Sequence, residues 1–197
     1  MASIQTIQTY HTPFKRHLAF FDRNNDGFIY LGESIRGCLS LGLNFPASLA
    51  MAMGMQVMYG NVGSPLYGPL RGIEIRNVRN ERYMLQRLTV VDDHKGTLTR
   101  GQLLDTTRKR KFIDQAHVYG IWALAANQDG QLSSHDLKLC REGLLLPEIE
   151  KRRRDQSDVL PFSRGGPISV SSHAWMVERM FGVRVYQNIK SDDTEGD

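Results

Sequence analysis

A twelve-residue stretch at 22–33, DRNNDGFIYLGE, sets the strongest requirement on the structure around it. Oxygen-bearing side chains stand at its first, third and fifth positions, a glycine at its sixth and a glutamate at its twelfth. This spacing surrounds a hard cation with oxygen ligands, while the glycine permits the sharp turn of the loop. A chance acidic turn is disfavoured because helical patterns flank the stretch on both sides. The sequence therefore predicts a calcium ion held by Asp22, Asn24, Asp26, the backbone carbonyl of Phe28, and Glu33.

A weaker copy of this EF-hand loop occupies 125–136. Its glycine and two of its oxygen ligands are kept, but Ala125 stands at the first position and Asp136 replaces the long glutamate at the twelfth. Because these two losses should greatly weaken calcium binding, we interpret the second loop as structural rather than as a working site. EF-hand loops usually pair through the apolar residue at position eight. We therefore predict that Ile29 lies beside Leu132.

The apolar pattern predicts a mostly α fold with a small β component, in which the EF-hand loop pairs with the degenerate second loop over a helical core. A chain of 197 residues that is 41% hydrophobic can bury such a core. The segment 155–170 carries prolines and glycines and is expected to be a loop. Helices are expected near 13–21, 31–41, 46–59, 99–108, 112–126, 134–146 and 172–182, and strands at 72–79 and 83–91.

Two parts of unequal length are expected along the chain. The first, residues 1–150, contains the EF-hand at 14–41, a charge-free segment at 37–70 and the degenerate EF-hand at 120–146. The second, residues 151–197, is a C-terminal extension of unknown role, and its acidic end is predicted to be disordered.

Composition disfavours several classes of protein. The two cysteines cannot form a disulfide framework and fit a reducing compartment. The first residues lack the apolar core of a secretory signal, so an intracellular location is expected. The net charge of +4 includes basic clusters at 108–111 and 151–154. No aromatic residues are interleaved with them, so we interpret both clusters as solvated helix ends and expect no nucleic-acid partner.

The segment 37–70 contains no Asp, Glu, Lys or Arg. A membrane-spanning helix needs about 20 strongly apolar residues, whereas this segment is interrupted by Asn44, Pro46 and Gln56. Two interpretations remain open: a buried core helix, or a monotopic segment that lies on a membrane or lipid-droplet surface without crossing it. Its methionines would also suit an adaptable pocket for an apolar substrate.

Several blocks in order resemble one family. The run HLAFFDRNNDGFIYLGESIRG resembles the caleosins, also called plant and fungal peroxygenases, which carry a histidine five residues before the first calcium ligand, as His17 stands before Asp22. The charge-free segment with its proline pair, Pro65 and Pro69, resembles their proline knot. The runs IEIRNV and DGQLSSHDLKLCREGLL resemble later parts of the family, so the likeness extends through about residues 14–146.

The resemblance implies a calcium-dependent haem protein that transfers oxygen from a hydroperoxide to an unsaturated lipid or another apolar small molecule. It implies His17 as a haem ligand. The second family histidine has no secure counterpart, and His94 and His117 are the candidates. A neutral imidazole is a suitable axial ligand, and His17 shares a helix face with apolar residues. The alternative for His17 is a core histidine satisfied by one hydrogen bond. The remaining histidines, His11, His135 and His173, are expected on the surface or in loops.

Two hypotheses for function follow. The first is a haem-dependent peroxygenase or related tailoring oxygenase. The second is a non-catalytic calcium-binding protein of a membrane or lipid-droplet surface. The family places such proteins at the surface of the endoplasmic reticulum or of lipid droplets, and a cytoplasmic protein is the other possibility. An absorption spectrum separates the two hypotheses, since only the first requires haem.

Overall fold

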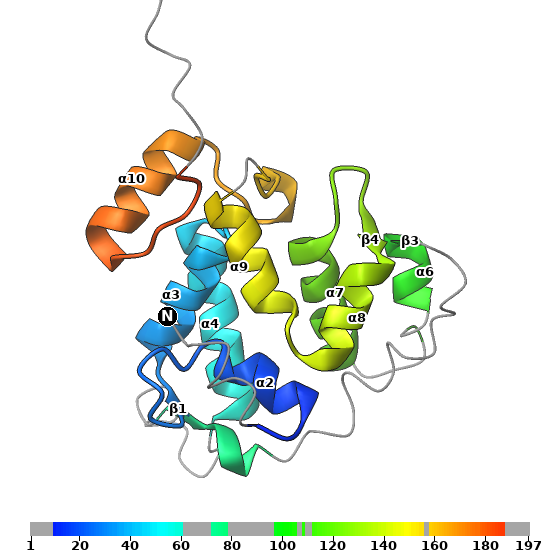
Figure 1. Cartoon of the computed structure of the whole chain (residues 1–197), viewed down its shortest axis with the longest axis horizontal. Helices are drawn as coiled ribbons and strands as arrows, with labels where there is room; N and C mark the ends of the chain where they lie inside the picture. Colours follow the sequence, from blue (N-terminus) through cyan, green and yellow to red (C-terminus); the bar gives the residue numbers. More distant parts are fainter. Residues whose placement is uncertain are drawn as a thin grey trace, which may run out of the picture.

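The computed structural model describes residues 10–60, 72–78, 97–105, 108, 112–155 and 158–187. Within these residues the fold is mostly helical, with eight α-helices and two two-stranded sheets. This confirms the predicted mostly α fold with a small β component. Figure 1 shows the first helices on one side of the molecule, α7 and α8 on the other, and α9 between them. The predicted strand at 83–91, the proline pair and the acidic tail lie outside the described residues.

The N-terminal helices begin where the sequence supplies caps. Helix α2 (Pro13–Ala19) follows Thr12, whose hydroxyl oxygen accepts the amide of Lys15 at 3.4 Å. Helix α3 (Leu31–Ser40) follows the first loop. Helix α4 (Phe45–Tyr59) follows Asn44, whose side-chain oxygen accepts the amide of Ala47 at 2.9 Å. Such caps satisfy amides that the helix itself leaves without a partner.

The strands correct one prediction. Strand β1 (Phe28–Ile29) pairs antiparallel with β2 (Ile73–Glu74), so Ile29 lies opposite Ile73. Strand β3 (Thr97–Thr99) pairs with β4 (Gln131–Ser133), which places Leu132 opposite Leu98. The predicted pairing of Ile29 with Leu132 is therefore wrong. Each loop needs only a short extended segment with an apolar residue as its partner. The segment around Ile73 is the partner of the first loop, and the segment around Leu98 is the partner of the second.

The predicted strand at 72–79 is also shorter than expected. Pairing stops after Glu74, and the chain turns into the 3₁₀-helix η1 (Ile75–Asn77). In the antiparallel register Ile75 continues towards Gly27, whose left-handed φ of 86° belongs to the turn of the 22–33 loop. One further bond, from the Ile75 amide to the Gly27 carbonyl at 3.1 Å, therefore ends the ladder. The alternating apolar residues of this segment do face the core, since Ile73 and Ile75 are both fully buried.

The second half of the fold is built from α6 (Arg100–Asp105), α7 (Phe112–Ala125), α8 (Ser134–Glu142) and α9 (Leu145–Asp155). The helix expected at 134–146 is interrupted at Gly143, which has a left-handed φ of 75°. A side chain at this position would collide with the carbonyl of Pro13 at the start of α2. The glycine therefore both ends α8 and lets the α8–α9 turn approach α2 closely.

The last described segment packs on the first helices. After the 3₁₀-helix η4 (Phe162–Arg164), helix α10 (Val170–Phe181) lies against α3, and Val177, Val183 and Val185 form a small core with Leu39. The loop expected at 155–170 is therefore confirmed only between these elements.

A buried polar hub fastens this C-terminal segment. Arg153 is 2% exposed and donates to the carbonyls of Leu124 (2.8 Å) and Asp158 (2.9 Å), and it forms an ion pair with the Asp158 carboxylate. The Tyr186 hydroxyl accepts the amide of Leu160 at 3.1 Å and donates to the carbonyl of Gly42 at 3.2 Å. These bonds join α7, α9, the end of α3 and the chain that follows α10.

We expect Tyr186→Phe to lower the free energy of unfolding by about 2 kcal/mol, because it leaves a buried amide and a buried carbonyl without their partner. Urea unfolding followed by circular dichroism measures this change. Tyr119→Phe is the matched control, since Tyr119 is exposed and its variant should stay within about 0.5 kcal/mol of the wild type. Equal stability of the two variants would show that the hub does not hold the segment.

Candidate functional site

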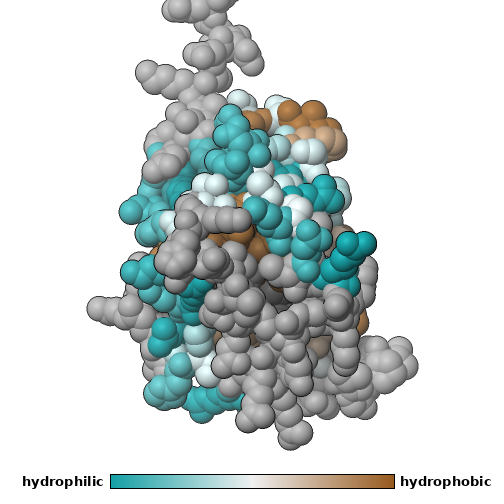
Figure 2. All heavy atoms as spheres, turned by 90° about the vertical axis from the view of Figure 1, so that its right-hand side faces the viewer, coloured by the Kyte–Doolittle hydropathy of each residue, from teal (hydrophilic) through white to brown (hydrophobic). Residues whose placement is uncertain are grey.

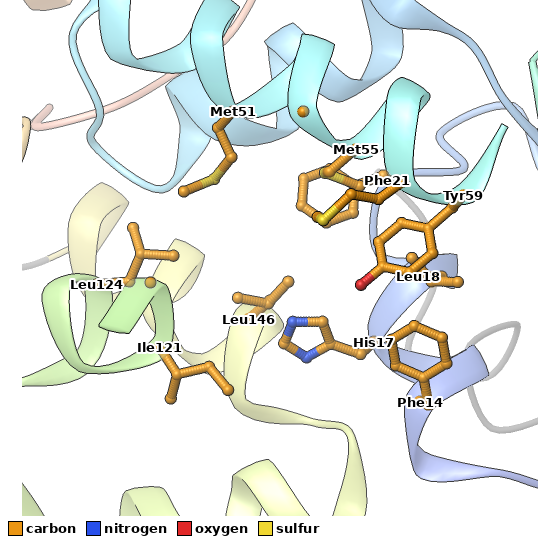
Figure 3. A pocket seen from close by; sticks show the side chains of 13 residues that line it. Phe14, His17, Leu18, Phe21, Met51, Met55, Tyr59, Ile121, Leu124 and Leu146 are labelled. Atoms are coloured by element: carbon orange, nitrogen blue, oxygen red, sulfur yellow. The ribbon is translucent and has the colours of Figure 1, made fainter. Parts of the chain in front are cut away.

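An apolar cavity lies between α2, α4, α7 and the start of α9, as Figure 3 shows. Its volume is about 190 Å³. Methionine, leucine, isoleucine and aromatic side chains form nearly all of its wall. The lining residues are Phe14, His17, Leu18, Phe21, Met51, Gly54, Met55, Met58, Tyr59, Gly120, Ile121, Leu124 and Leu146. The predicted apolar face of the first helix and the predicted methionine-rich wall therefore meet in one cavity.

His17 reaches this cavity from the last turn of α2. It is 8% exposed, and Figure 3 shows its imidazole pointing into the cavity. The placement follows from helical spacing, because Phe14, His17, Leu18 and Phe21 repeat every three or four residues on the buried face of α2 and the turn after it. A buried imidazole in an apolar wall can serve as a ligand or exchange a proton.

The other candidate haem ligands are less well defined. His94 lies outside the described residues. His117 belongs to α7, four residues before the lining residue Ile121, but its side chain also lies outside the described part. His11 and His135 are exposed as predicted.

The prediction for His173 is wrong, because it is 6% exposed in α10 and packs 6.3 Å from the ring of Tyr186. Burial there lowers the pKa of His173. It belongs to the small core beneath α10 and does not line the cavity. The sequence contained a signal for this burial, since His173 and Val177 are four residues apart on one helix face.

The two cysteines belong to the core, as predicted. Cys38 and Cys140 are both fully buried, and burial raises the pKa of each thiol to about 12. A thiol with such a pKa stays protonated at neutral pH, whereas the thiolate is the form that binds metals. Neither cysteine lines the cavity, and among the described lining residues His17 supplies the imidazole.

The 22–33 loop folds around its own acidic side chains. Asp22 is 3% exposed, and its two carboxylate oxygens accept the amides of Asp26 (3.2 Å) and Gly27 (2.9 Å). Asn24 also accepts the amide of Asp26, at 3.0 Å, and Asp26 accepts the amide of Phe28 at 2.8 Å. Asn25 and Gly27 have left-handed φ values of 61° and 86°, which produce the sharp turn that the glycine predicted.

Glu33 closes the loop from the first turn of α3. Its carboxylate accepts the amide of Arg23 at 3.3 Å with one oxygen and that of Tyr30 at 3.0 Å with the other. Glu33 is 8% exposed. A buried carboxylate that reaches both ends of the loop is placed to share its oxygens between backbone amides and a cation.

The predicted calcium ligands do not already form a metal-binding cluster. Among the described residues, no three Asp, Glu, His or Cys side chains gather closely enough to hold a metal ion. The loop carboxylates bond to backbone amides instead, and burial raises the pKa of Asp22. A raised folded pKa means that ionising Asp22 costs stability as the pH rises through that pKa. A bound cation would offset this cost, and the predicted set also draws oxygens from Asn24 and the Phe28 carbonyl.

The second loop uses its polar groups internally. The carboxylate of Asp136, at the twelfth position, accepts the Ser133 hydroxyl at 2.8 Å and forms an ion pair with Arg152 of α9, while the Asp136 amide donates to the Ser133 hydroxyl oxygen at 3.1 Å. The side-chain oxygen of Asn127 accepts the amide of Gln131 at 2.9 Å. Both groups therefore stabilise the loop and its junction with α9, in line with the structural interpretation.

Three connections link the first loop to the cavity. Helix α2 carries His17 five residues before Asp22. Gln56 of α4 donates to the carbonyl of Ile29 at 3.0 Å. Arg23 forms an ion pair with Glu150 of α9 at 3.0 Å and donates to the Ser40 hydroxyl at 2.7 Å. Sequence reasoning missed Gln56, Arg23 and the cavity residue Tyr59, since only the packing of α4 and α9 shows their roles.

Comparison with known protein families gives a match to the first half of the chain. The model of the family described as Caleosin related protein matches residues 9–103, which include α2, the 22–33 loop, α4 and β2. No solved structure matches the chain. The matched segment contains both His17 and the predicted calcium ligands. Over residues 9–103, this chain therefore matches the caleosin-related protein family.

Proposed function

We propose that this protein is a calcium-dependent haem peroxygenase, or a related tailoring oxygenase, that acts on an apolar unsaturated substrate. The observation that carries the proposal is the buried His17 imidazole in the wall of an otherwise apolar cavity, within the segment that matches the family. Caleosins are known as haem peroxygenases, which gives this arrangement a chemical precedent.

Two features of the cavity bear on whether haem fits: the imidazole that would bind the iron, and the apolar side chains of the wall. An imidazole is an established axial ligand of haem iron, and His17 points into the cavity. The described residues enclose about 190 Å³, below the roughly 300–1,000 Å³ of most ligand pockets. Residues 79–96, which include His94, lie outside the described part.

When bound, haem would supply the transfer of oxygen from a hydroperoxide to the substrate. The chain's own contribution is binding and exclusion of water. The leucine, isoleucine and phenylalanine side chains would hold an apolar substrate. The flexible side chains of Met51, Met55 and Met58 would adapt the wall to its shape. An apolar lining also strengthens the few polar contacts that remain inside it.

We propose that calcium binds Asp22, Asn24, Asp26, the Phe28 carbonyl and Glu33 and rigidifies the wall that holds His17. The support is the direct passage of α2 into the loop, together with the Arg23–Glu150 ion pair to α9, which contributes Leu146 to the cavity. Ordering the loop would fix the end of α2 on which the imidazole stands.

The test of the proposal is a haem titration of the purified full chain with and without calcium, followed by an assay of hydroperoxide-dependent epoxidation or sulfoxidation. We expect a Soret band that saturates at one haem per chain, and oxygen transfer that depends on the hydroperoxide. Chelation of calcium should lower both the haem affinity and the rate of oxygen transfer. A protein that shows no Soret band with added haem would refute the enzyme proposal.

A second role is favoured by the unusual exposure of α4, and we propose that this helix contacts a lipid surface. Its polar residues Ser48 and Gln56 are buried, whereas Met53 and Val57 are 53% and 72% exposed. No helix among the described residues is long and apolar enough to span a bilayer. By contrast, the face that carries α6 has a mainly hydrophilic surface where described atoms reach it (Figure 2). The endoplasmic reticulum and lipid droplets are the proposed locations.

We expect the wild type to float with liposomes, and the double variant Met53→Glu/Val57→Glu to remain in the dense fraction, because each charge would have to leave water to stay bound. The control Gln128→Glu/Ser134→Glu adds the same charge at exposed positions of the second loop and should float like the wild type. Flotation of the α4 variant at wild-type levels, or no flotation of the wild type, would contradict the proposal.

A further inference from the structure

Two glycines, Gly54 of α4 and Gly120 of α7, belong to the cavity wall. Figure 3 shows Met51 and Met55 of α4 on a different side of the cavity from Leu124 of α7. Gly54 lies between Met51 and Met55 on the lining face of its helix. In the same way, Gly120 lies one turn before Leu124 on α7. A side chain at either glycine position would therefore point into the cavity.

Neither glycine is explained by the helix that contains it. Glycine in a helix interior costs stability relative to alanine. A left-handed φ would justify this cost, but neither Gly54 nor Gly120 has one. A close neighbour would also justify it, as at Gly37 of α3, where an added Cβ would collide with the ring of Phe21. An added Cβ at Gly54 or Gly120 would meet no described atom within 4 Å. What the two glycines preserve is the open space of the cavity itself.

We propose that Gly54 and Gly120 form a slot that receives the hydrocarbon part of the substrate and limits how wide that part can be. Without side chains in the way, an apolar chain can approach the two helix backbones closely. The amides and carbonyls there are bonded within their helices, so the slot offers no polar partner. No Asp, Glu, Lys or Arg is among the described lining residues, so an uncharged apolar group is the ligand that fits.

The inference rests on the proposed function for the identity of the substrate, but the slot can bind a hydrocarbon without haem. The variants that test it are Gly54→Ala and Gly120→Ala, which each add one methyl group to the slot. Gly101→Ala is the matched control, because Gly101 is an exposed glycine of α6 that also has no described atom within 4 Å of an added Cβ and does not line the cavity. All three variants should raise the melting temperature of the full chain by about 2 °C, because alanine favours the helix and has room.

Binding should separate the control from the slot variants. The measurement is isothermal titration of the haem-free full chain with 1-octanol, an uncharged molecule with a short hydrocarbon chain. We expect Gly101→Ala to bind 1-octanol like the wild type. Gly54→Ala and Gly120→Ala should bind it about tenfold more weakly, since the added methyl occupies space that the ligand needs. Gly54→Leu should bind it more weakly still. A protein that is more stable yet binds less cannot owe its weaker binding to damage of the fold.

A haem titration of the same variants distinguishes this inference from the proposed function. Weaker binding of 1-octanol by the slot variants supports the inference even if no protein binds haem, in which case the haem proposal alone fails. Equal binding of 1-octanol by all variants, or none by the wild type, would overturn the inference. It would also be overturned if the slot variants lost affinity for haem alone, because the slot would then hold haem rather than the substrate. A lower melting temperature in both alanine variants would show that the slot is closed in solution.

Discussion

Replacing His17 with alanine is expected to abolish haem binding and every activity that depends on it. The variant removes the imidazole that lines the described part of the cavity, and we propose this imidazole as the iron ligand. Loss of a group that merely supports a metal ligand already costs about 10- to 100-fold in affinity, so loss of the ligand itself should cost at least about 100-fold. Haem titration followed by the Soret band measures this change, and the oxygen-transfer assay measures its consequence.

Two controls make the His17 result specific. His135→Ala removes an exposed histidine of α8 and should bind haem like the wild type. Far-ultraviolet circular dichroism should show that His17→Ala keeps its helices, since the apolar residues around position 17 still bury α2. Full haem content in His17→Ala would refute the ligand assignment. His117→Ala then becomes the informative variant, because position 117 precedes the lining residue Ile121 by one turn of α7.

The parts of the site that lie within one short stretch could be predicted from the sequence. The face of α2 and the turn of the 22–33 loop depend on spacings of three to five residues, which local geometry dictates. His17 therefore enters an apolar cavity as expected. The positions of Thr12 and Asn44 likewise mark the helix starts, because their side chains bond to amides three residues later.

The pairing of the loops depended on a choice between distant segments that the sequence did not resolve. Three short segments, around Ile73, Leu98 and Leu132, all offered an apolar residue next to a polar one. In the folded structure Leu98 lies opposite Leu132 in the sheet, and Ile73 lies opposite Ile29.

The orientation of α4 was not predictable for a different reason. Its residues are apolar around the whole helix, so periodicity does not reveal which face is buried. Packing against α3 and the bond from Gln56 to the 22–33 loop decide the orientation. That orientation then places Tyr59 in the cavity and leaves Val57 exposed.

The second large effect is expected from Glu33→Gln, which should weaken calcium binding by on the order of 100-fold. The change removes one negative charge from the proposed ligands and replaces a carboxylate that can bind a cation through both oxygens. Gln keeps one oxygen acceptor, so only one of the bonds to Arg23 and Tyr30 is lost. The calcium-free variant should therefore be only about 1 kcal/mol less stable than the wild type.

Isothermal titration measures the affinity, and thermal unfolding measures its consequence for stability. Calcium at 100 times its dissociation constant should stabilise the wild type by about 2.7 kcal/mol, whereas the same concentration should leave Glu33→Gln nearly unchanged. Asp129→Asn is the matched control, because it removes one charge from the second loop, which we interpret as structural. Equal calcium binding by the wild type and Glu33→Gln would refute the proposed ligands.

The same variant tests whether calcium acts on the cavity. Ordering of the 22–33 loop should reach His17 through α2 and Leu146 through the Arg23–Glu150 ion pair. Glu33→Gln should then bind haem more weakly than the wild type in calcium, but equally well in chelator, because neither protein holds the ion there. If both bind haem equally in calcium while only the wild type binds the ion, calcium stabilises the loop without acting on the cavity.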